Sequence, residues 1–269
     1  MVFAYHDVGV RCLRVLLDAG VRVPLVVTHR DDPAEKVWFA SVSDFSRSVH
    51  IDTLEDPPEL RIPQTDFIFS FYYRRMLPQR ILNHAGKGAF NMHGSLLPKY
   101  RGRAPVNWAV LHGETETGAT LHEMTEKPDA GRIVDQQRVP IGPDDLAVDV
   151  FRRVTDAAEA VLKRNLKKLI HGEADLRPQD LSKGSYFGGR KPEDGRIDWS
   201  KSAWEVHNLV RAVAPPYPGA FTTGMKILRT QIEKNKAFLK KGPYQEDGQW
   251  FAGCGDGKVL RLLEVIAEP

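Results

Sequence analysis

Short apolar runs alternate with helical stretches through the first half of the chain. Four such runs are rich in β-branched and aromatic residues and predict buried strands, at residues 2–5, 23–28, 67–71 and 88–91. Between the first two runs, residues 10–18 have the spacing of an amphipathic helix that Gly20 is expected to end. Short buried strands joined by helices predict an α/β fold, with a mostly parallel sheet covered by helices on both faces.

The pattern becomes richer in short β-like runs towards the C-terminus. Later elements are predicted as strands at residues 118–122 and 133–139, helices at 149–169 and 203–213, and β-like runs at 220–223, 226–228 and 259–265. We therefore predict two domains. Residues 1–201 form a Rossmann-like α/β domain, and residues 202–269 form a small, β-rich, OB-like subdomain.

Composition and charge narrow the class of protein. Of the 269 residues, 42% are hydrophobic and 27% are charged, which is ordinary for a globular chain. The 38 basic and 35 acidic residues leave a formal charge of +3, too small by itself to indicate nucleic-acid binding. No apolar run approaches the roughly 20 residues that cross a bilayer, and the N-terminus lacks the pattern of a secretory signal. Cys12 and Cys254 form neither a disulfide framework nor a metal motif, so a cytoplasmic protein without membrane insertion is expected.

A carboxamide and an imidazole lie two residues apart at the end of a predicted strand. Asn91 and His93 point to the same face if the chain is extended there, so both can act on one substrate atom. The Asn91 amide can donate to a developing oxyanion, and His93 can take or give a proton near neutral pH. Asp129, from a later segment, can orient His93 or a water and favour the charged imidazole. These are the roles that acyl transfer to an amine requires.

No nucleophile accompanies this trio in the sequence. Ser95 lies two residues from His93, but no G-x-S-x-G elbow surrounds it, so direct transfer without a covalent intermediate is predicted. The first strand-turn-helix lacks G-x-G-x-x-G, and no phosphate loop of the G-x-x-x-x-G-K-[ST] type follows a strand. The remaining histidines have no ligand spacing, so no metal site is expected. Asn-x-His alone is a common pattern, but residues 94–105 add glycines, prolines and cations that a structural loop rarely needs.

The segment from Asn91 to Pro105, Asn-Met-His-Gly-Ser-Leu-Leu-Pro-Lys-Tyr-Arg-Gly-Arg-Ala-Pro, resembles the signature of the folate-dependent formyltransferases. Glu-Thr-Glu-Thr-Gly at residues 114–118 and Asp-Ala-Gly at residues 129–131 match later landmarks of that family. The resemblance extends from Val2 to about Gly219, and its motif cluster is specific.

The flanking segments resemble one subgroup more closely. They are Phe-Ala-Tyr-His-Asp at 3–7, Thr28-His29, Glu35-Lys36, Phe-Ser-Phe-Tyr-Tyr-Arg at 69–74, Asn-Leu-Val-Arg-Ala-Val at 208–213 and Cys-Gly-Asp-Gly at 254–257. This subgroup is the bacterial domain that formylates UDP-4-amino-4-deoxy-L-arabinose during the lipid A modification that confers polymyxin resistance. The resemblance implies a possible fused or separate partner, a decarboxylating dehydrogenase.

What the resemblance implies about the site is specific. It implies 10-formyltetrahydrofolate as donor, an amino-sugar nucleotide as acceptor, and Asn91, His93 and Asp129 as catalytic residues. It also implies a folate pocket lined largely through backbone atoms, by Arg75, Met76, Leu77, Arg103, Thr125, Glu126, Lys127, Pro128 and Asp129. Independently of the resemblance, phenol and guanidinium groups suit an acceptor sugar or its phosphates. This reasoning makes Tyr72, Tyr73, Arg74 and Arg190 tentative acceptor contacts, against the alternative of a packed aromatic pair and a solvated loop.

Three alternatives stay open at this point. The acceptor can be another UDP- or dTDP-linked amino sugar. A methionyl-tRNA formyltransferase is a second candidate, although the charge of +3 and the short C-terminal region argue against a large polyanionic partner. A folate-binding domain without catalysis is the third, and the trio Asn91, His93 and Asp129 argues against it.

Overall fold

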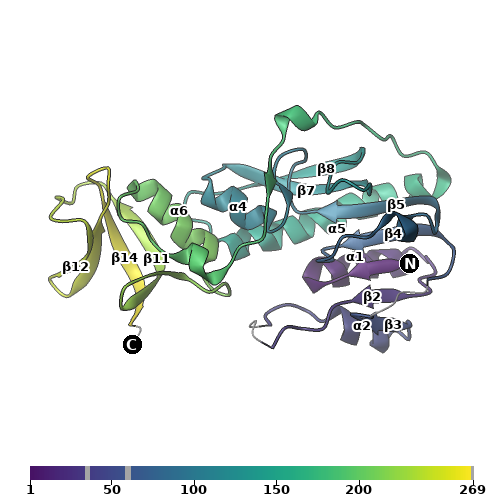
Figure 1. Cartoon of the computed structure of the whole chain (residues 1–269), viewed down its shortest axis with the longest axis horizontal. Coiled ribbons are helices and arrows are strands. Elements are labelled where there is room, and N and C mark those ends of the chain that lie inside the picture. The colour runs from purple at the N-terminus through teal and green to yellow at the C-terminus, as the bar shows by residue number, and fades with distance from the viewer. Residues whose placement is uncertain (34–36, 58–61, 268–269) are drawn as a thin grey trace. The chain divides into compact units, whose positions relative to one another are not determined.

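The computed structural model describes residues 1–33, 37–57 and 62–267 of the chain (Figure 1). The resemblance noted at Glu35-Lys36 therefore lies outside the described residues. The chain divides into two compact units, each built from separate segments. The first unit contains Met1–Gly102, Gly118–Val139 and Arg153–Tyr186, and the second contains Arg103–Thr117, Pro140–Arg152 and Phe187–Pro269. The domain boundary between residues 201 and 202 remains a proposal.

The first unit is organised around a seven-stranded sheet with the order β3-β2-β1-β4-β5-β7-β8. Its strands are β1 (Val2–Ala4), β2 (Val26–Thr28), β3 (Thr53–Glu55), β4 (Thr65–Phe71), β5 (Ala85–His93), β7 (Glu116–Glu123) and β8 (Ile133–Pro140). The pairs β2–β3, β1–β2, β1–β4 and β4–β5 are parallel, whereas β5 and β7 are antiparallel. The predicted mostly parallel α/β sheet is confirmed.

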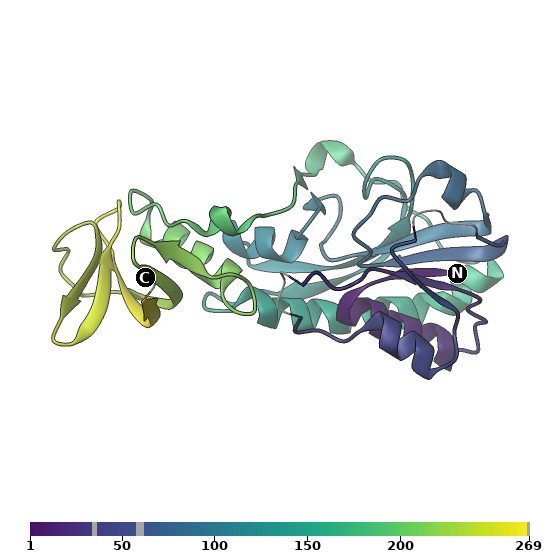
Figure 2. The same cartoon turned by 60° about the horizontal axis from the view of Figure 1, so that its bottom comes forward.

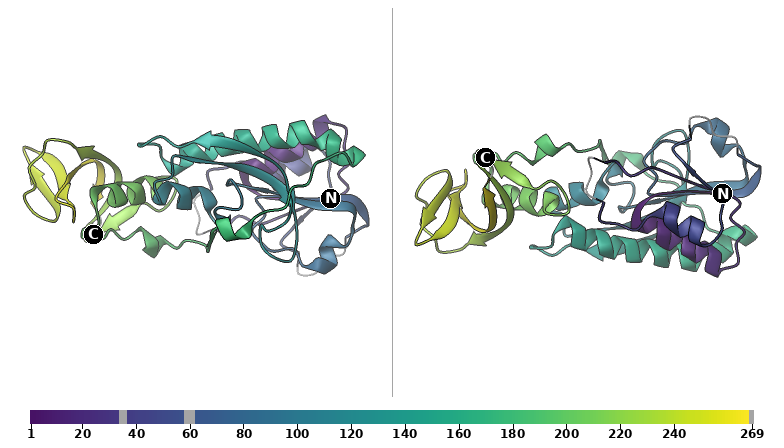
Figure 3. Two further views of the ribbon diagram at one scale, coloured as in Figure 1. Left: turned by 90° about the horizontal axis from the view of Figure 1, so that it is seen from above. Right: turned by 90° about the horizontal axis from the view of Figure 1, so that it is seen from below.

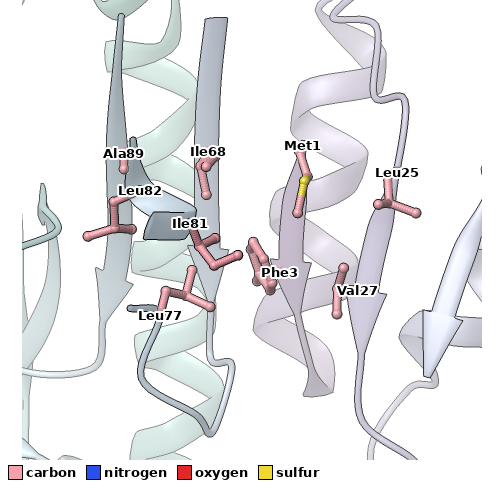
Figure 4. Packing of buried hydrophobic residues seen from close by; sticks show 9 residues of the cluster. All are labelled: Met1, Phe3, Leu25, Val27, Ile68, Leu77, Ile81, Leu82 and Ala89. Carbon is pink, nitrogen blue, oxygen red and sulfur yellow. The ribbon is translucent and has the colours of Figure 1, made fainter. Parts of the chain in front are cut away.

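Helices lie on both faces of this sheet. The described helices of the unit are α1 (His6–Asp18), α2 (Val42–Ser48), α3 (Gln79–Leu82) and most of α5 (Ala147–His171). Arg11 of α1 pairs with Asp156 and Glu159 of α5, so these two helices run side by side, as Figures 2 and 3 show. The short helix α3 lies on the opposite face (Figure 4). The helix predicted at residues 10–18 begins earlier, at His6.

An apolar cluster fills the face that α3 covers. Alternate strand residues point to one face, and here they contribute Met1, Phe3, Leu25, Val27, Ile68 and Ala89 (Figure 4). Leu77, Ile81 and Leu82 close the cluster from α3 and the loop before it. Because side chains fill both faces, polar chemistry is left to the ends of the strands, where open α/β sheets bind ligands.

The second unit contains the C-terminal sheet, five antiparallel strands in the order β10-β11-β14-β13-β12 (Figure 1). Its elements are α4 (Pro105–Leu111), α6 (Ala203–Val213), β10 (Ala220–Thr222), β11 (Met225–Glu233), β12 (Gly242–Glu246), β13 (Gln249–Gly253) and β14 (Val259–Ala267). The predicted β-rich C-terminal region is confirmed, although β12 and β13 were not predicted. Smaller elements are β6 (Arg101–Gly102), β9 (Tyr186–Phe187) and two 3-10 turns, Leu181–Lys183 and Pro192–Gly195. Within the described residues, every helix is too short or too polar to cross a membrane.

Candidate active site

Two neighbouring strands place three polar side chains at one end of the sheet. Asn91 and His93 lie at the C-terminal end of β5, where the parallel pairing with β4 ends. Strand β7 runs antiparallel to β5 and sets His122 directly opposite Asn91. The predicted Asn91 and His93 pair therefore sits where a strand ends, and His122 joins it through the register of the next strand.

These side chains converge on a single carboxylate oxygen. Asp129 Oδ1 lies 3.3 Å from Asn91 Nδ2, 3.6 Å from His93 Nδ1 and 3.3 Å from His122 Nε2. The other oxygen of Asp129 accepts a hydrogen bond of 2.8 Å from the Gly102 backbone N–H. The three residues predicted to work together are thus brought together within the first unit, with Asp129 as their common neighbour.

The hydrogen bond of His93 to a backbone carbonyl fixes which nitrogen can accept a proton. His93 Nε2 lies 2.7 Å from the Tyr100 carbonyl oxygen, so Nε2 carries a hydrogen and donates it. In the neutral ring Nδ1 then holds a lone pair, and its 3.6 Å separation from Asp129 is too long for a hydrogen bond. Nδ1 is therefore available as a proton acceptor.

Burial decides the charge of His93. The residue is only 6% exposed, and burial lowers its pKa below the ordinary value despite the opposing effects of Asp129 and the Tyr100 carbonyl. The prediction that Asp129 keeps His93 charged is not supported by this balance, because desolvation outweighs the attraction of one carboxylate. The resting imidazole is neutral near pH ~7, which is the form that accepts a proton.

Asp129 remains ionised in the same surroundings. Burial by itself would raise its pKa, but the neighbouring His93 and His122 and the Gly102 N–H together hold the pKa well below its usual range. A fixed negative charge therefore faces His93 Nδ1. It would stabilise the imidazolium that forms once His93 has taken a proton.

His122 is the member of the site that sequence reasoning missed. In the sequence it is one of several scattered histidines without ligand spacing. Its Nδ1 lies 2.7 Å from the Glu123 carbonyl, which leaves Nε2 to accept from Asn91 Nδ2 at 3.2 Å in the neutral ring. This contact orients the carboxamide of Asn91. The alternation of residues 118–122 predicts a strand but gives no information about which residue of β5 lies opposite His122.

The loop between His93 and Gly102 is folded to present backbone groups. Ser95 donates to the Lys99 carbonyl at 2.7 Å, so its hydroxyl is part of the loop rather than a free nucleophile. Tyr100, whose carbonyl holds His93, has a positive φ of 57°, and Asp129 has a φ of 50°. Such conformations are uncommon for residues with side chains and tend to cluster at functional sites. Gln179 supports the Asp129 turn by donating to the Asp129 carbonyl at 3.0 Å.

Apart from Arg103, the residues expected to line a folate pocket occupy two loops of the first unit. Arg75 and Met76 are exposed after β4, whereas Leu77 is buried in the cluster of Figure 4. In the loop between β7 and β8, Thr125, Glu126 and Lys127 are exposed and Pro128 is half-buried before Asp129. Burial of the Leu77 side chain leaves its backbone atoms for a ligand, and the folate contacts of both loops remain predictions.

The tentative acceptor residues of the first unit divide into packed and exposed groups. Tyr73 is partly buried against the cluster of Figure 4 and stacks on His29 with ring centroids 4.1 Å apart. Tyr72 has a φ of 61°, and burial raises its pKa to about 12. Arg74 is exposed and its guanidinium lies 4.7 Å from the centre of the Tyr5 ring. Tyr73 has a structural role, which the sequence left open, and roles in acceptor binding remain predictions.

Arg103 and Arg190 belong to the second unit, where one glycine loop brings them together. The Arg190 guanidinium lies 4.8 Å above the Trp108 ring, and Trp108 Nε1 donates to the Gly188 carbonyl at 3.0 Å. A Cβ on Gly189 would lie 3.3 Å from Arg103 Nη1, so the glycine allows the close approach of this cation. The sequence had assigned the two arginines to different ligands, and both assignments remain predictions.

Across residues 1–33, 37–57 and 62–267, no three His, Cys, Asp or Glu side chains are grouped so that they could hold a metal ion.

Solved structures with the same fold span nearly the whole chain. An N-formyltransferase from Helicobacter canadensis, solved with folinic acid and dTDP-3-aminofucose, is 22% identical with a TM-score of 0.80, covering 97% of each chain. WlaRD, a sugar 3N-formyltransferase solved with dTDP and 5-N-formyltetrahydrofolate, is 22% identical with a TM-score of 0.79, covering 97% of this chain and 96% of that one. A 4-N-formyltransferase from Francisella tularensis is 20% identical with a TM-score of 0.63, covering 80% of this chain and 89% of that one.

Family models match the chain over both of its parts. Residues 21–166 match the formyl transferase model, and residues 190–268 match the model of the formyl transferase C-terminal domain. The first match includes all of Asn91, His93, His122 and Asp129. The predicted resemblance is therefore confirmed at the level of the family, and this chain belongs to the formyl transferases.

Proposed function

We propose that this enzyme transfers the formyl group of 10-formyltetrahydrofolate to the amine of a nucleotide-linked amino sugar. The observation that carries the proposal is the convergence of Asn91, His93 and His122 on Asp129 Oδ1 in a formyl transferase chain. The arrangement supplies a proton acceptor, an amide donor and a fixed negative charge. No serine or cysteine with an activating base joins it among the described residues.

The proposed reaction is a direct displacement at the formyl carbon. The sugar amine attacks that carbon and gives a proton to His93 Nδ1, while the carbonyl oxygen becomes an oxyanion. Asn91 Nδ2 stabilises the oxyanion, which replaces its long 3.3 Å contact to Asp129. The bond between the formyl carbon and N10 of the folate then breaks, and N10 takes the proton from His93 Nδ1, which returns His93 to its neutral form. The products are the N-formyl sugar nucleotide and tetrahydrofolate.

His122 and Asp129 prepare the two groups that act on the reacting atoms. His122 Nε2 holds the carboxamide of Asn91 so that its N–H side faces Asp129. The negative charge of Asp129 stabilises the protonated His93 that forms during attack. Burial therefore favours the neutral resting state of His93, and the negative charge of Asp129 stabilises the protonated state.

Two loops beside the trio suit the folate. The residue pairing of β4 and β5 sets Ser70 opposite Asn91, so the segment at Arg75–Leu77 leaves the sheet close to the reacting side chains. Asp129 itself lies in the second loop, between β7 and β8, directly after Thr125–Pro128. Exposed backbone N–H and C=O groups in such loops can form hydrogen bonds with flat heteroaromatic ligands such as folate.

For the acceptor we propose UDP-4-amino-4-deoxy-L-arabinose, with a role in lipid A and lipopolysaccharide modification. The support for this acceptor is the resemblance at residues 69–74 and 208–213. The neighbours of the same fold that were solved with dTDP or a dTDP-linked amino sugar support only the wider class of nucleotide-linked amino sugars. Another UDP- or dTDP-linked amino sugar is the first alternative to this substrate.

The test is a substrate panel read by mass spectrometry. The protein is incubated with 10-formyltetrahydrofolate and with UDP- and dTDP-linked 4-amino sugars, or with charged initiator tRNA. We expect a mass gain of one formyl group on UDP-4-amino-4-deoxy-L-arabinose, and none when His93→Ala replaces the wild type. Gain on a dTDP sugar alone would overturn the substrate, gain on tRNA alone would overturn the sugar class, and no transfer to any acceptor would overturn the proposal.

A further inference from the structure

A histidine outside the trio forms a hydrogen bond with the backbone that follows strand β4. His29 follows β2, and its Nε2 accepts a hydrogen bond of 3.0 Å from the Arg74 backbone N–H. The same ring stacks on Tyr73, with centroids 4.1 Å apart and planes inclined by 14°. On its other side, His29 Nδ1 lies 2.8 Å from Asp56 Oδ1. One imidazole thus contacts two successive residues of the segment after β4 and a carboxylate beyond β3.

Asp56 contacts the next residue of this segment, Arg75. Its carboxylate pairs with the Arg75 guanidinium at 2.8 Å and accepts from the Arg30 backbone N–H at 2.9 Å. Asp56 therefore contacts both Arg30, which follows β2, and Arg75, which follows β4. Together, His29 and Asp56 contact Tyr73, Arg74 and Arg75 in turn.

These contacts require the neutral form of His29. Because the Arg74 N–H is a donor, Nε2 must accept, so the single ring hydrogen is on Nδ1 and is donated to Asp56. Burial lowers the pKa of His29, and Arg75 and Arg74 add to that effect, while Asp56 opposes it. The other groups facing the ring are the phenols of Tyr73 and Tyr5. A proton added at Nε2 would point at the Arg74 N–H and break the contact.

Residues 73–75 follow β4 at the end of the sheet where Asn91 and His93 lie. Phe71 of β4 lies opposite Met92 of β5, one residue before His93. The chain then turns sharply at Tyr72, whose φ is 61°, before it reaches Tyr73. After this turn the Tyr73 ring packs on Phe3 of β1, with centroids 5.2 Å apart, while His29 and Asp56 hold the Arg74 backbone N–H and the Arg75 side chain.

We propose that His29, with Asp56, is a positioning residue that holds residues 73–75, so that the adjoining segment Arg75–Leu77 keeps the shape that binds the folate substrate. The inference rests on the proposed function, because the ligand of this segment is the formyl donor. It predicts that folate affinity depends on the neutral state of His29, although His29 does not touch the reacting atoms.

Direct binding of 5-formyltetrahydrofolate, a stable analogue of the donor, tests this inference by isothermal titration calorimetry. His29→Ala is expected to raise the Kd roughly 10-fold, as the loss of one backbone hydrogen bond and its support would do. At saturating donor, kcat is expected to stay within about threefold of wild type, since the trio is unchanged. His171→Ala, an exposed histidine at the end of α5, serves as the matched control.

A conservative variant separates positioning from simple packing. His29→Gln retains an acceptor for the Arg74 N–H and a donor for Asp56, but it cannot titrate. We expect its Kd near pH ~7.5 to match wild type, and we expect it to lack the rise in Kd that protonation of His29 would cause in wild type at pH values well below ~6.5. This comparison does not depend on His29→Ala being folded.

The outcomes are distinguishable from failure of the proposed function. Wild-type protein that does not bind 5-formyltetrahydrofolate contradicts the proposed function and this inference with it. A wild-type Kd in folded His29→Ala, or the same acid dependence in wild type and His29→Gln, contradicts this inference alone.

Discussion

Replacing Asp129 with asparagine isolates the charge that faces His93. The substitution keeps the shape of the side chain and an acceptor for the Gly102 N–H, which lies 2.8 Å away. It removes the negative charge 3.6 Å from His93 Nδ1, where both side chains are at most 12% exposed. The effect of Asp129→Asn therefore reports on the stabilisation of protonated His93.

The magnitude follows from the distance between the charges. With an effective dielectric constant of ~20, two unit charges at this separation attract by roughly 4–5 kcal/mol. Because each ~1.4 kcal/mol corresponds to tenfold in rate, full loss of the attraction would slow the step by about 10³-fold. Some of the attraction is recovered from the amide dipole, so we expect kcat to fall by about 10²–10³-fold.

The pH dependence of kcat gives a second test of the role of the Asp129 charge. The pKa of Asp129 is held well below its usual range, so this carboxylate stays ionised throughout an assay from about pH 5 to 9. The acid limb of kcat then reflects protonation of His93, whose pKa is lowered by burial and raised again by Asp129. Without that charge the pKa of His93 falls further, so the acid limb moves to lower pH while the plateau drops.

Single-turnover formyl transfer across this pH range measures both quantities. Asp180→Asn is the matched control, because Asp180 is an exposed aspartate of the same unit that faces Ser182 and Lys183. A plateau within about threefold of wild type, or an acid limb that moves to higher pH in Asp129→Asn, would refute the role given to the charge.

Three further predictions concern stability and support of the site. Burial lowers the pKa of His6 from 6.5 to about 3, with Arg74 contributing, so the unfolded chain binds a proton first and stability falls as pH drops below ~6.5. Between pH ~6.5 and ~5, urea unfolding should show wild type losing about 2 kcal/mol more than His6→Asn, and equal losses would contradict the sign. Ile68→Ala, at a fully buried position, should cost about 2–5 kcal/mol of unfolding free energy, whereas Met76→Ala, 57% exposed, should cost under ~0.5; similar costs would contradict the core assignment. Gln179→Ala removes the donors to the Asp129 and Gly131 carbonyls and should lower kcat roughly 10-fold in a folded protein, so unchanged turnover would exclude this support.

The long elements of the fold were predictable because their patterns depend on local burial. The helix at residues 149–169 has many apolar positions on one face and appears as α5. The strand at residues 133–139 has apolar residues at both ends and appears as β8. Short or polar elements carry too little of this signal. Strand β3 has three residues, and β12 contains glycine, proline and glutamate, so both depend on pairing with a neighbour rather than on their own pattern.

The site was predictable where its residues are close in sequence. Asn91 and His93 point to one face because they are two apart on a strand, and that geometry follows from the chain alone. His122 could not be assigned, since its place opposite Asn91 depends on strand register. The neutral state of His93 could not be assigned either, because it results from burial and from a carbonyl of Tyr100 that only the folded loop brings near.

The central claim is that the trio transfers the formyl group directly, and a comparison of alanine variants tests it. Single-turnover transfer from 10-formyltetrahydrofolate to the accepted amino sugar is measured for Asn91→Ala, His93→Ala and Asp129→Ala, each shown to be folded by circular dichroism. We predict that each variant is slower than wild type by at least ~10²-fold, as the loss of one oxyanion donor or proton acceptor requires. Wild-type rates in all three folded variants would contradict the account.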